Sequence, residues 1–239
     1  YTGDRDFSPR ASAAFNLGRG FTLRAGWGHY RQMQGIDEVA TLNNDKFDEF
    51  RTLFSAYPDI ELVPATALIR NPEGLAFAER HDTYLENATA KARLANLASH
   101  YPSLADDSGI EVDGLEGKPG VRSHRYATPR AGISQDQANV ERMISEVGTK
   151  SRSARFVCTL VLVIEGILIH ATGTLEGSIT DQPRGTNGFG YDPIFVPKGS
   201  ARTFAEMTSA EKNMISHRSK ALHELMAKVK NHGVVFAKP

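Results

Sequence analysis

An apolar run, followed by a tight turn and a second segment, constrains the fold of this chain most strongly. Residues 156–164 read Phe-Val-Cys-Thr-Leu-Val-Leu-Val-Ile, and the segment 167–175 follows after Glu165 and Gly166. A membrane-spanning helix needs about 20 apolar residues, so the run 156–164 is too short to form one. The pattern is typical of two paired strands that are joined by a hairpin and buried in a sheet.

Helical patterns alternate with strand patterns along the rest of the chain from Val39 onward. Three capping boxes predict helix starts, at Thr83–Glu86, Ser134–Gln137 and Thr208–Glu211. The spacing i, i+3, i+4, i+7 of a core-facing helix occurs twice, at Val140, Met143, Ile144 and Val147 and at Leu222, Leu225, Met226 and Val229. Asn43 or Asn44 can cap a helix with Phe47, Phe50 and Phe54 on one face, and short strands are expected at Ile60–Val63 and Ser103–Asp106. We therefore predict an α/β domain with a mixed sheet flanked by helices.

Residues 1–38 differ in character from the rest of the chain. The segments 11–17 and 21–27 are separated by Gly18-Arg19-Gly20, and the second alternates apolar and other residues, which predicts a β-hairpin. This hairpin resembles a fragment of the outer-membrane receptor barrels that couple to TonB. Residues 1–38 are therefore either a foreign or accessory leader or an ordinary hairpin that packs on the main domain, residues 39–239.

Charge and cysteine content restrict the possible functions. Lys plus Arg and Asp plus Glu both number 28, so the chain lacks the basic excess of a nucleic-acid-binding protein. Cys158, the only cysteine, lies in an apolar run and is expected to be a small buried residue. Because one cysteine forms no disulfide and no signal-peptide pattern is visible, we expect a cytoplasmic protein without a membrane or nucleic-acid partner.

Two adjacent carboxylates form the first candidate site. Asp106 and Asp107 are expected to end a strand and enter a turn at Ser108-Gly109, whose N–H groups can face an anion. Alternation along a strand places the two side chains on opposite faces. Buried carboxylates are costly unless they are paired or bind a metal, but acidic turns are common, so both a functional and a structural interpretation stay open.

A glycine-rich loop forms the second candidate site. Residues 183–193 read Pro-Arg-Gly-Thr-Asn-Gly-Phe-Gly-Tyr-Asp-Pro. The glycines allow the backbone to approach a ligand closely, and Phe189 and Tyr191 can stack on a planar base. The alternative is a tight hairpin whose aromatic side chains pack inward.

Two further segments carry cationic and polar side chains. Residues 211–218 read Glu-Lys-Asn-Met-Ile-Ser-His-Arg, and cations and free N–H groups near helix starts can bind phosphate or base oxygens. Residues 40–46 read Ala-Thr-Leu-Asn-Asn-Asp-Lys, a strand-to-helix turn that can hold a triphosphate. A solvated helix face explains the first segment equally well, and a plain helix cap explains the second.

The order of these segments resembles the inosine triphosphate pyrophosphatase family, the noncanonical purine NTP pyrophosphatases. The family motifs are Thr-x-Asn-x-x-Lys, Asp-Asp-Ser-Gly-hydrophobic-x-Val-Asp, Gly-x-Pro-Gly-Val, Gly-Phe-Gly-Tyr-Asp-Pro-hydrophobic-Phe and Glu-Lys-x-x-Ile-Ser-His-Arg. The matching segments here are Thr41–Lys46, Asp106–Asp113, Gly117–Val121, Gly188–Phe195 and Glu211–Arg218. The resemblance covers about 200 residues.

The resemblance implies an elongated homodimeric enzyme with a nucleotide cleft between two lobes. Such enzymes use Mg²⁺ to cleave a purine nucleoside triphosphate between the α- and β-phosphates. Asp107 would be the catalytic carboxylate, and Glu79 and Asp107 would be metal ligands. The phosphate path would be lined by Thr41, Asn43, Lys46 and Ser108. The nucleotide pocket would be formed by Phe189, Gly190, Tyr191, Asp192, Lys212, His217 and Arg218.

The preference for a noncanonical purine follows from hydrogen-bond chemistry. The 6-keto oxygen of hypoxanthine or xanthine accepts hydrogen bonds from donors such as His217 or Arg218, whereas the 6-amino group of adenine would meet another donor. Guanine also has a 6-keto oxygen, so its exclusion requires a penalty against the 2-amino group.

The chain departs from the family pattern at two places. The family has a short apolar strand before Thr41, where this chain has Gly35-Ile-Asp-Glu-Val39. Near Glu79 the sequence Glu-Arg-His-Asp replaces the usual acidic-Gly pattern, so His81 is either a transition-metal ligand or an exposed loop residue. The alternatives are a related pyrophosphatase for modified pyrimidine or methylated nucleotides, a nucleotide-binding protein without activity, and a membrane-barrel fragment.

Overall fold

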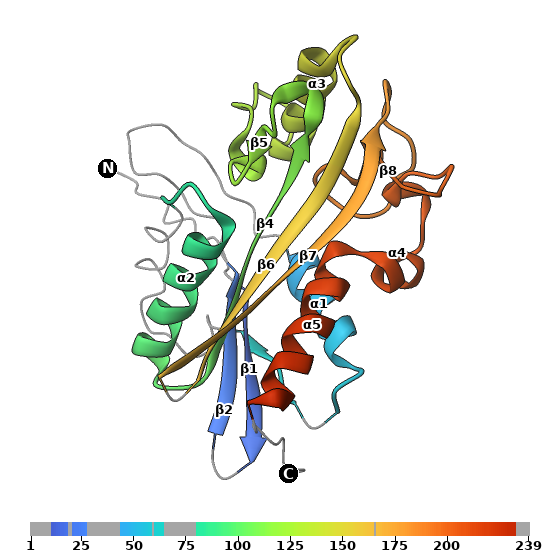
Figure 1. The fold of residues 1–239 in the computed structure, drawn as a ribbon. Helices are drawn as coiled ribbons and strands as arrows, with labels where there is room; N and C mark the ends of the chain where they lie inside the picture. The colour runs from blue at the N-terminus through green and yellow to red at the C-terminus, as the bar shows by residue number, and fades with distance from the viewer. Residues whose placement is uncertain are drawn as a thin grey trace. The chain divides into compact units, whose positions relative to one another are not determined.

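The computed structural model describes residues 11–18, 21–27, 44–58, 60–64, 80–164 and 166–232 (Figure 1). The chain divides into two compact units. Unit 1 consists of residues 1–106, 160–170 and 226–239, and unit 2 consists of residues 107–159 and 171–225. The predicted residues Thr41, Asn43 and Glu79 lie outside the described ranges.

The described residues form a mixed sheet with helices, which confirms the predicted fold class. The helices are α1 (Asn44–Phe54), α2 (Tyr84–Ser99), α3 (Gln135–Val147), α4 (Ser209–Ile215) and α5 (His217–Asn231). The strands are β1 (Ala11–Gly18), β2 (Phe21–Trp27), β3 (Val63–Pro64), β4 (Ser103–Val112), β5 (Pro119–Gly120), β6 (Ser153–Ile164), β7 (Ile167–Ile179) and β8 (Phe195–Pro197). Hydrogen-bonded neighbours follow the order β1-β2-β4-β6-β7-β8, and β5 pairs with β4.

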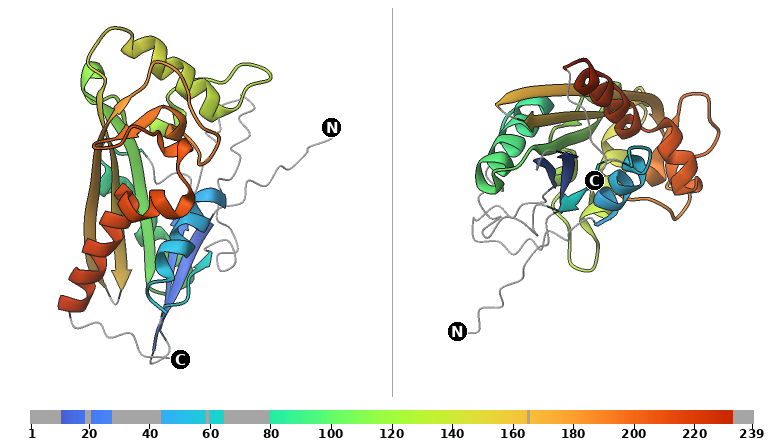
Figure 2. Two further views of the ribbon diagram at one scale, coloured as in Figure 1. Left: turned by 90° about the vertical axis from the view of Figure 1, so that its right-hand side faces the viewer. Right: turned by 90° about the horizontal axis from the view of Figure 1, so that it is seen from below.

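The hairpin β1–β2 joins unit 1 by strand pairing. Its strands are antiparallel, with Ala11 opposite Trp27, which confirms the predicted hairpin. Strand β2 then runs parallel to β4, with Gly26 opposite Ala105. The hairpin also lies beside α1 (Figure 2). The parallel pairing makes residues 21–27 a neighbour of the strand that carries the paired carboxylates.

Small side chains pack helix α2 closely against the sheet of unit 1. Ala88 and Ala92 of α2 contact Ala105 of β4 in a buried cluster that also includes Val161 and Val163 of β6. Alanine has no side chain beyond Cβ, so the helix and the strands can approach each other closely. The predicted strand at Ile60–Val63 is shifted, because β3 begins only at Val63.

The core of unit 2 contains larger side chains, from α3, β4, β6, β8 and the 3-10 helix η6 (Phe204–Glu206). Phe156, Phe195 and Phe204 contact one another, with ring centroids 4.5 Å apart for Phe156 and Phe195, 5.4 Å for Phe195 and Phe204, and 5.9 Å for Phe156 and Phe204. Cys158 on β6 is fully buried, as predicted for a small hydrophobic residue. Across the described ranges, no helix is both long enough and apolar enough to cross a membrane.

The predicted helix starts are confirmed, but their caps differ. Thr83 and Ser134 cap α2 and α3 through their hydroxyl oxygens. At α4, both halves of the capping box form between Thr208 and Glu211. A further capping box, which we did not predict, forms at the start of η6 between Thr203 and Glu206. The capping pattern therefore located the helix starts more reliably than it predicted the reciprocal hydrogen bond.

Candidate functional site

The loop before η5 (Asp192–Ile194) is shaped by two glycines and one carboxylate. Gly188 and Gly190 have φ angles of 75° and 61°, in the left-handed region. The Phe189 N–H donates to Asp192 Oδ2 over 3.0 Å. A Cβ atom at Gly188 would lie 2.0 Å from that same oxygen. Glycine is therefore required at Gly188, because a side chain there would collide with the carboxylate that holds the loop.

A buried ion pair connects this loop to helix α4. Lys212 Nζ donates to Asp192 Oδ2 over 2.6 Å, and the two side chains are 7% and 4% exposed. Lys212 Nζ also lies 4.5 Å from the centre of the Phe189 ring, a cation–π distance. The capping box at Thr208 begins the helix that carries Lys212. Asp192 thus orients both the cation and the loop backbone.

The first turn of helix α5 carries two more residues of the predicted nucleotide pocket. His217 is 1% exposed, and its ring stacks on Phe156 with centroids 4.7 Å apart. Arg218 is 4% exposed, and its guanidinium lies 5.2 Å from the centre of the Phe189 ring. Ser216, just before the helix, accepts the N–H of Ser219 and so caps it. The Ser-His-Arg sequence therefore combines a helix cap with two buried nitrogen-bearing side chains.

Gly173 on strand β7 lies against the first turn of helix α5. A Cβ atom at Gly173 would lie 2.1 Å from the carbonyl oxygen of His217 and 2.4 Å from the backbone nitrogen of Ala221. Any larger residue at Gly173 would displace the start of α5. Gly173 therefore determines how closely His217 and Arg218 approach the strand, a role that the sequence motifs did not indicate.

Tyr191 is the anchor of the loop. Its side chain is 5% exposed and belongs to the core of unit 2. The hydroxyl donates to the carbonyl oxygen of Ser123 over 2.7 Å. Burial raises the pKa of Tyr191 above its usual range, so the hydroxyl keeps its proton. Of the two aromatic residues predicted to stack on a base, Tyr191 is thus buried, whereas Phe189 is half-buried.

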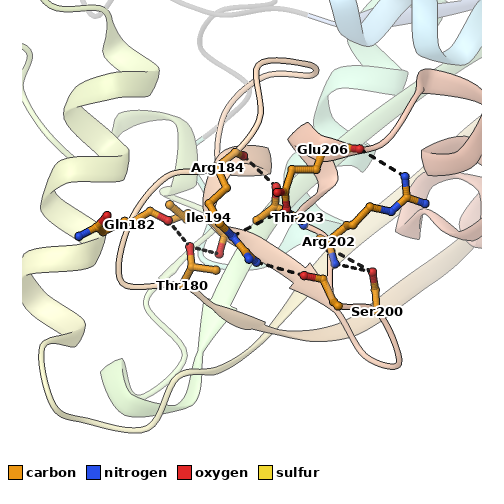
Figure 3. Close-up of polar contacts among 9 residues, drawn as sticks. Thr180, Gln182, Arg184, Ile194, Ser200, Arg202, Thr203 and Glu206 are labelled. Atoms are coloured by element: carbon orange, nitrogen blue, oxygen red, sulfur yellow. Dashed lines mark hydrogen bonds and ion pairs between the residues drawn. The ribbon is translucent and has the colours of Figure 1, made fainter.

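Polar contacts also brace the ends of the glycine-rich loop (Figure 3). The Thr203 hydroxyl donates to the carbonyl oxygen of Arg184 over 2.8 Å, and the Arg184 N–H donates to the carbonyl oxygen of Pro193 over 2.8 Å. The Thr180 hydroxyl donates to the carbonyl oxygen of Gln182 over 2.7 Å. The loop is therefore tied to its own flanking residues and to the start of η6, which restricts the positions that Phe189 can occupy.

The carboxylate pair lies within strand β4, which corrects the prediction of a Ser-Gly turn. The strand continues through Ser108 to Val112, and β5 pairs with it at Ile110 and Glu111, beyond the carboxylates. The N–H of Ile110 also donates to the hydroxyl of Ser123 over 2.8 Å. Extended backbone places Asp106 and Asp107 on opposite faces of the strand, as predicted. Their exposed fractions are 0% and 7%.

In unit 1, Asp106 lies near one predicted phosphate-binding residue. Lys46 on α1 is half-buried, and its Nζ lies 4.0 Å from Asp106 Oδ2. Asp107 and the half-buried Ser108 begin unit 2. The structure thus brings Lys46 to Asp106 in unit 1, and it separately gathers Phe189, Asp192, Lys212 and Arg218 in unit 2.

His81 is exposed, just before α2. Its backbone N–H and carbonyl oxygen both bond to the side chain of Asn87, over 2.9 and 3.2 Å. The described ranges contain no group of three or more His, Cys, Asp or Glu side chains able to hold a metal ion.

Residues 38–228 match the family model described as Ham1 family. A dITP/XTP pyrophosphatase of Shouchella clausii is 44% identical over 193 residues, which cover 78% of this chain and 92% of that protein. This chain belongs to the Ham1 family. A second relative, a dITP/XTP pyrophosphatase of Aquifex aeolicus, is 38% identical over 200 residues, covering 81% of this chain and 96% of that protein.

Solved Ham1 structures agree with this assignment. The Ham1 protein of Staphylococcus aureus is 33% identical with a TM-score of 0.63, covering 81% of this chain and 97% of that one. A HAM1 protein of Coxiella burnetii is 35% identical with a TM-score of 0.67, covering 80% of this chain and 96% of that one. The Ham1 family match begins at residue 38, and the comparisons do not support the predicted resemblance of residues 1–38 to a TonB-coupled receptor.

Proposed function

We propose that this Ham1 protein hydrolyses noncanonical purine nucleoside triphosphates, including inosine and xanthosine triphosphates, to the monophosphate and pyrophosphate. Its relatives at 44% and 40% identity are named dITP/XTP pyrophosphatases. The structural observation that carries the proposal is the arrangement around Phe189, where Lys212 and Arg218 lie within cation–π distance of one half-buried ring. Such a hydrolase removes damaged nucleotides from the pool.

The base would be recognised in unit 2. Phe189 offers a ring for stacking, and Gly190, Tyr191 and Asp192 shape the loop that presents it. Arg218 and His217 supply donors for the 6-keto oxygen of hypoxanthine or xanthine. The 6-amino group of adenine would face those donors, and a site built to pair with an acceptor rejects such a base strongly. Lys212 adds positive charge beside the ring.

The triphosphate would be bound by Thr41, Asn43, Lys46 and Ser108. In the described part of this set, Lys46 carries a positive charge and Ser108 a half-buried hydroxyl. Cationic and hydroxyl donors offset the negative charge that grows on the departing pyrophosphate. A water molecule would attack the α-phosphorus, the bond from this phosphorus to the bridging oxygen would break, and Asp107 would accept the proton of the water.

Glu79 and Asp107 would hold a magnesium ion. Asp107 fits this ion, because it is a buried carboxylate and Mg²⁺ takes one or two carboxylates together with phosphate oxygens and water. When bound, the ion offsets phosphate charge and polarises the phosphoryl group under attack. Asp106, on the opposite face of β4, would instead orient Lys46.

Measured pyrophosphate release from a substrate panel would test the function. The panel contains inosine, xanthosine, guanosine, adenosine, cytidine and uridine triphosphates, each with Mg²⁺ and with a chelator. We expect fast turnover of inosine and xanthosine triphosphates that the chelator abolishes. Preferred turnover of a pyrimidine would indicate the related pyrophosphatase instead, and tight binding of inosine triphosphate without turnover would indicate a nucleotide-binding protein.

Location and assembly complete the proposal. A nucleotide-pool hydrolase works where the nucleotides are, so we place this protein in the cytoplasm. Following the family resemblance, we propose a homodimer. Sedimentation equilibrium would give about twice the chain mass of 26.2 kDa for the dimer, and the chain mass itself would contradict it.

A further inference from the structure

A second carboxylate reaches the Phe189 loop from a helix far away in the sequence. Asp136 lies in the first turn of α3, and its Oδ2 accepts the N–H of Gly190 over 2.7 Å. The helix does not use this carboxylate as its cap, because Ser134 accepts the N–H of Gln137 over 3.1 Å. Asp136 thus has its carboxylate available for the loop.

Hydrogen bonds, rather than side-chain packing, confine the backbone at Gly190. Gly190 is half-buried, but a Cβ atom built on it would meet nothing within 4 Å, so no neighbouring atom fills the space where a side chain would begin. Glycine is also the residue with the widest choice of backbone conformations. Two successive N–H groups are nevertheless bound to carboxylates, Phe189 to Asp192 over 3.0 Å and Gly190 to Asp136 over 2.7 Å.

Phe189 lies between the two fixed points. Its ring has Lys212 Nζ at 4.5 Å and the Arg218 guanidinium at 5.2 Å from the ring centre. Releasing the Gly190 N–H would free the C-terminal side of Phe189, while Asp192 would still hold the other side. The ring would then sample several positions, and a stacked base would lose a preorganised surface.

We propose that Asp136 is a positioning residue for base recognition, which it achieves by fixing the Phe189 ring through the Gly190 N–H. The inference rests on the proposed function, since it assumes that a purine base stacks on Phe189. Helix α3 is anchored separately by Val140, Met143 and Val147 in the core of unit 2. Loss of the Asp136 carboxylate should therefore change the loop and leave the helix in place.

The test compares Asp136→Ala and Asp136→Asn with Glu141→Gln in the full-length protein. Glu141 lies on the same helix, where it pairs with the exposed Arg130 over 2.7 Å, so it controls for loss of a carboxylate from α3. For each variant, KM and kcat are measured with inosine and adenosine triphosphates, and inhibition is measured with inorganic pyrophosphate. Circular dichroism melting confirms that each variant is folded.

Asp136→Ala should raise KM for inosine triphosphate roughly 10-fold, since a charged hydrogen bond is lost. It should also lower the ratio of kcat/KM for inosine triphosphate to kcat/KM for adenosine triphosphate. Inhibition by pyrophosphate should stay unchanged, because pyrophosphate has no base. Asp136→Asn should lie between the wild type and Asp136→Ala, since its amide oxygen still accepts a hydrogen bond. Glu141→Gln should match the wild type.

Two results would overturn the proposal for Asp136. One is a folded Asp136→Ala variant whose KM for inosine triphosphate, and whose preference for it over adenosine triphosphate, are the same as in the wild type. If the alanine variant does not fold, the same result in Asp136→Asn would overturn the proposal. The other is an equal loss of inosine triphosphate and pyrophosphate affinity, which would indicate general damage. Wild-type protein without any turnover of inosine triphosphate would instead refute the proposed function.

Discussion

Lys212 and Asp192 form a buried ion pair, with Lys212 Nζ 2.6 Å from Asp192 Oδ2. The same oxygen also accepts a hydrogen bond from the N–H of Phe189. One carboxylate oxygen therefore connects the cation, the loop and the ring. A buried ion pair contributes little net stability, but removing one partner leaves an uncompensated buried charge. The arrangement makes the geometry of the loop dependent on the pair.

Asp192→Asn should therefore destabilise the protein by about 3–5 kcal/mol, the usual cost of breaking a buried pair. Urea unfolding monitored by circular dichroism would measure the loss. The double variant Asp192→Asn with Lys212→Met should recover part of it, because the uncompensated ammonium is removed. If the free energy of unfolding lost by the double variant equals the sum of the losses of the two single variants, the broken ion pair is not the cause of the destabilisation.

Gly188→Ala should abolish most activity, because its Cβ would lie 2.0 Å from the Asp192 carboxylate. Gly132→Ala is the matched control. Gly132 also has a left-handed φ, of 87°, but a Cβ atom there would meet nothing within 4 Å. The left-handed backbone costs each variant roughly 1–2 kcal/mol. Turnover of inosine triphosphate and urea unfolding should show a larger loss for Gly188→Ala than for Gly132→Ala, and equal losses would contradict the clash.

Asp107→Asn should reduce turnover of inosine triphosphate at least about 100-fold, the usual effect of losing a general base. Calorimetric titration should show that the variant still binds the nucleotide, because the base-recognition residues are unchanged. Asp106→Asn is the neighbouring comparison, since Asp106 faces Lys46. It should mainly raise KM. An active Asp107→Asn enzyme would remove Asp107 from the proposed catalytic role.

The capping box of α4 should become weaker in acid. Hydrogen bonds from Arg202 and from the backbone and hydroxyl of Thr208 lower the pKa of Glu211 from 4.5 to about 2. A carboxyl whose pKa is lower in the folded state stabilises that state above pH 4.5 and loses this effect as the pH falls towards 2. The unfolding midpoints of wild type and Glu211→Gln should therefore differ at pH 6 and converge near pH 2. A difference that does not change with pH would exclude this charge effect.

Deleting residues 1–38 should lower stability and raise KM for inosine triphosphate. Strand β2 pairs with β4 up to Ala105, directly before Asp106, so the deletion would leave one edge of β4 without this partner. Asp106 in turn faces Lys46, a proposed phosphate ligand. Urea unfolding and steady-state kinetics of the two chain lengths would measure both effects. Identical behaviour would show that the hairpin is an accessory leader.

Local patterns in the sequence were sufficient to predict many elements of this fold. Thr83, Ser134 and Thr208 marked helix starts, because an N-cap side chain bonds to backbone only three residues away. The hairpin around Gly166 and the hairpin at residues 11–27 followed from short-range alternation and turn residues. The family motifs also named Lys212 and Arg218, because motif matching needs only the order of residues along the chain.

Contacts between distant segments required the tertiary structure. Asp136 and Gly190 are 54 residues apart, and the Tyr191 hydroxyl bonds to Ser123, 68 residues away. Past the carboxylates, β4 continues in a sheet in which β6 is its neighbour and β5 pairs with Ile110 and Glu111. A capping box or a hairpin is determined by neighbouring residues, so the sequence alone determined those elements. A hydrogen bond between separate elements depends on how the whole chain packs, so only the tertiary structure decided which carboxylates hold the Phe189 loop.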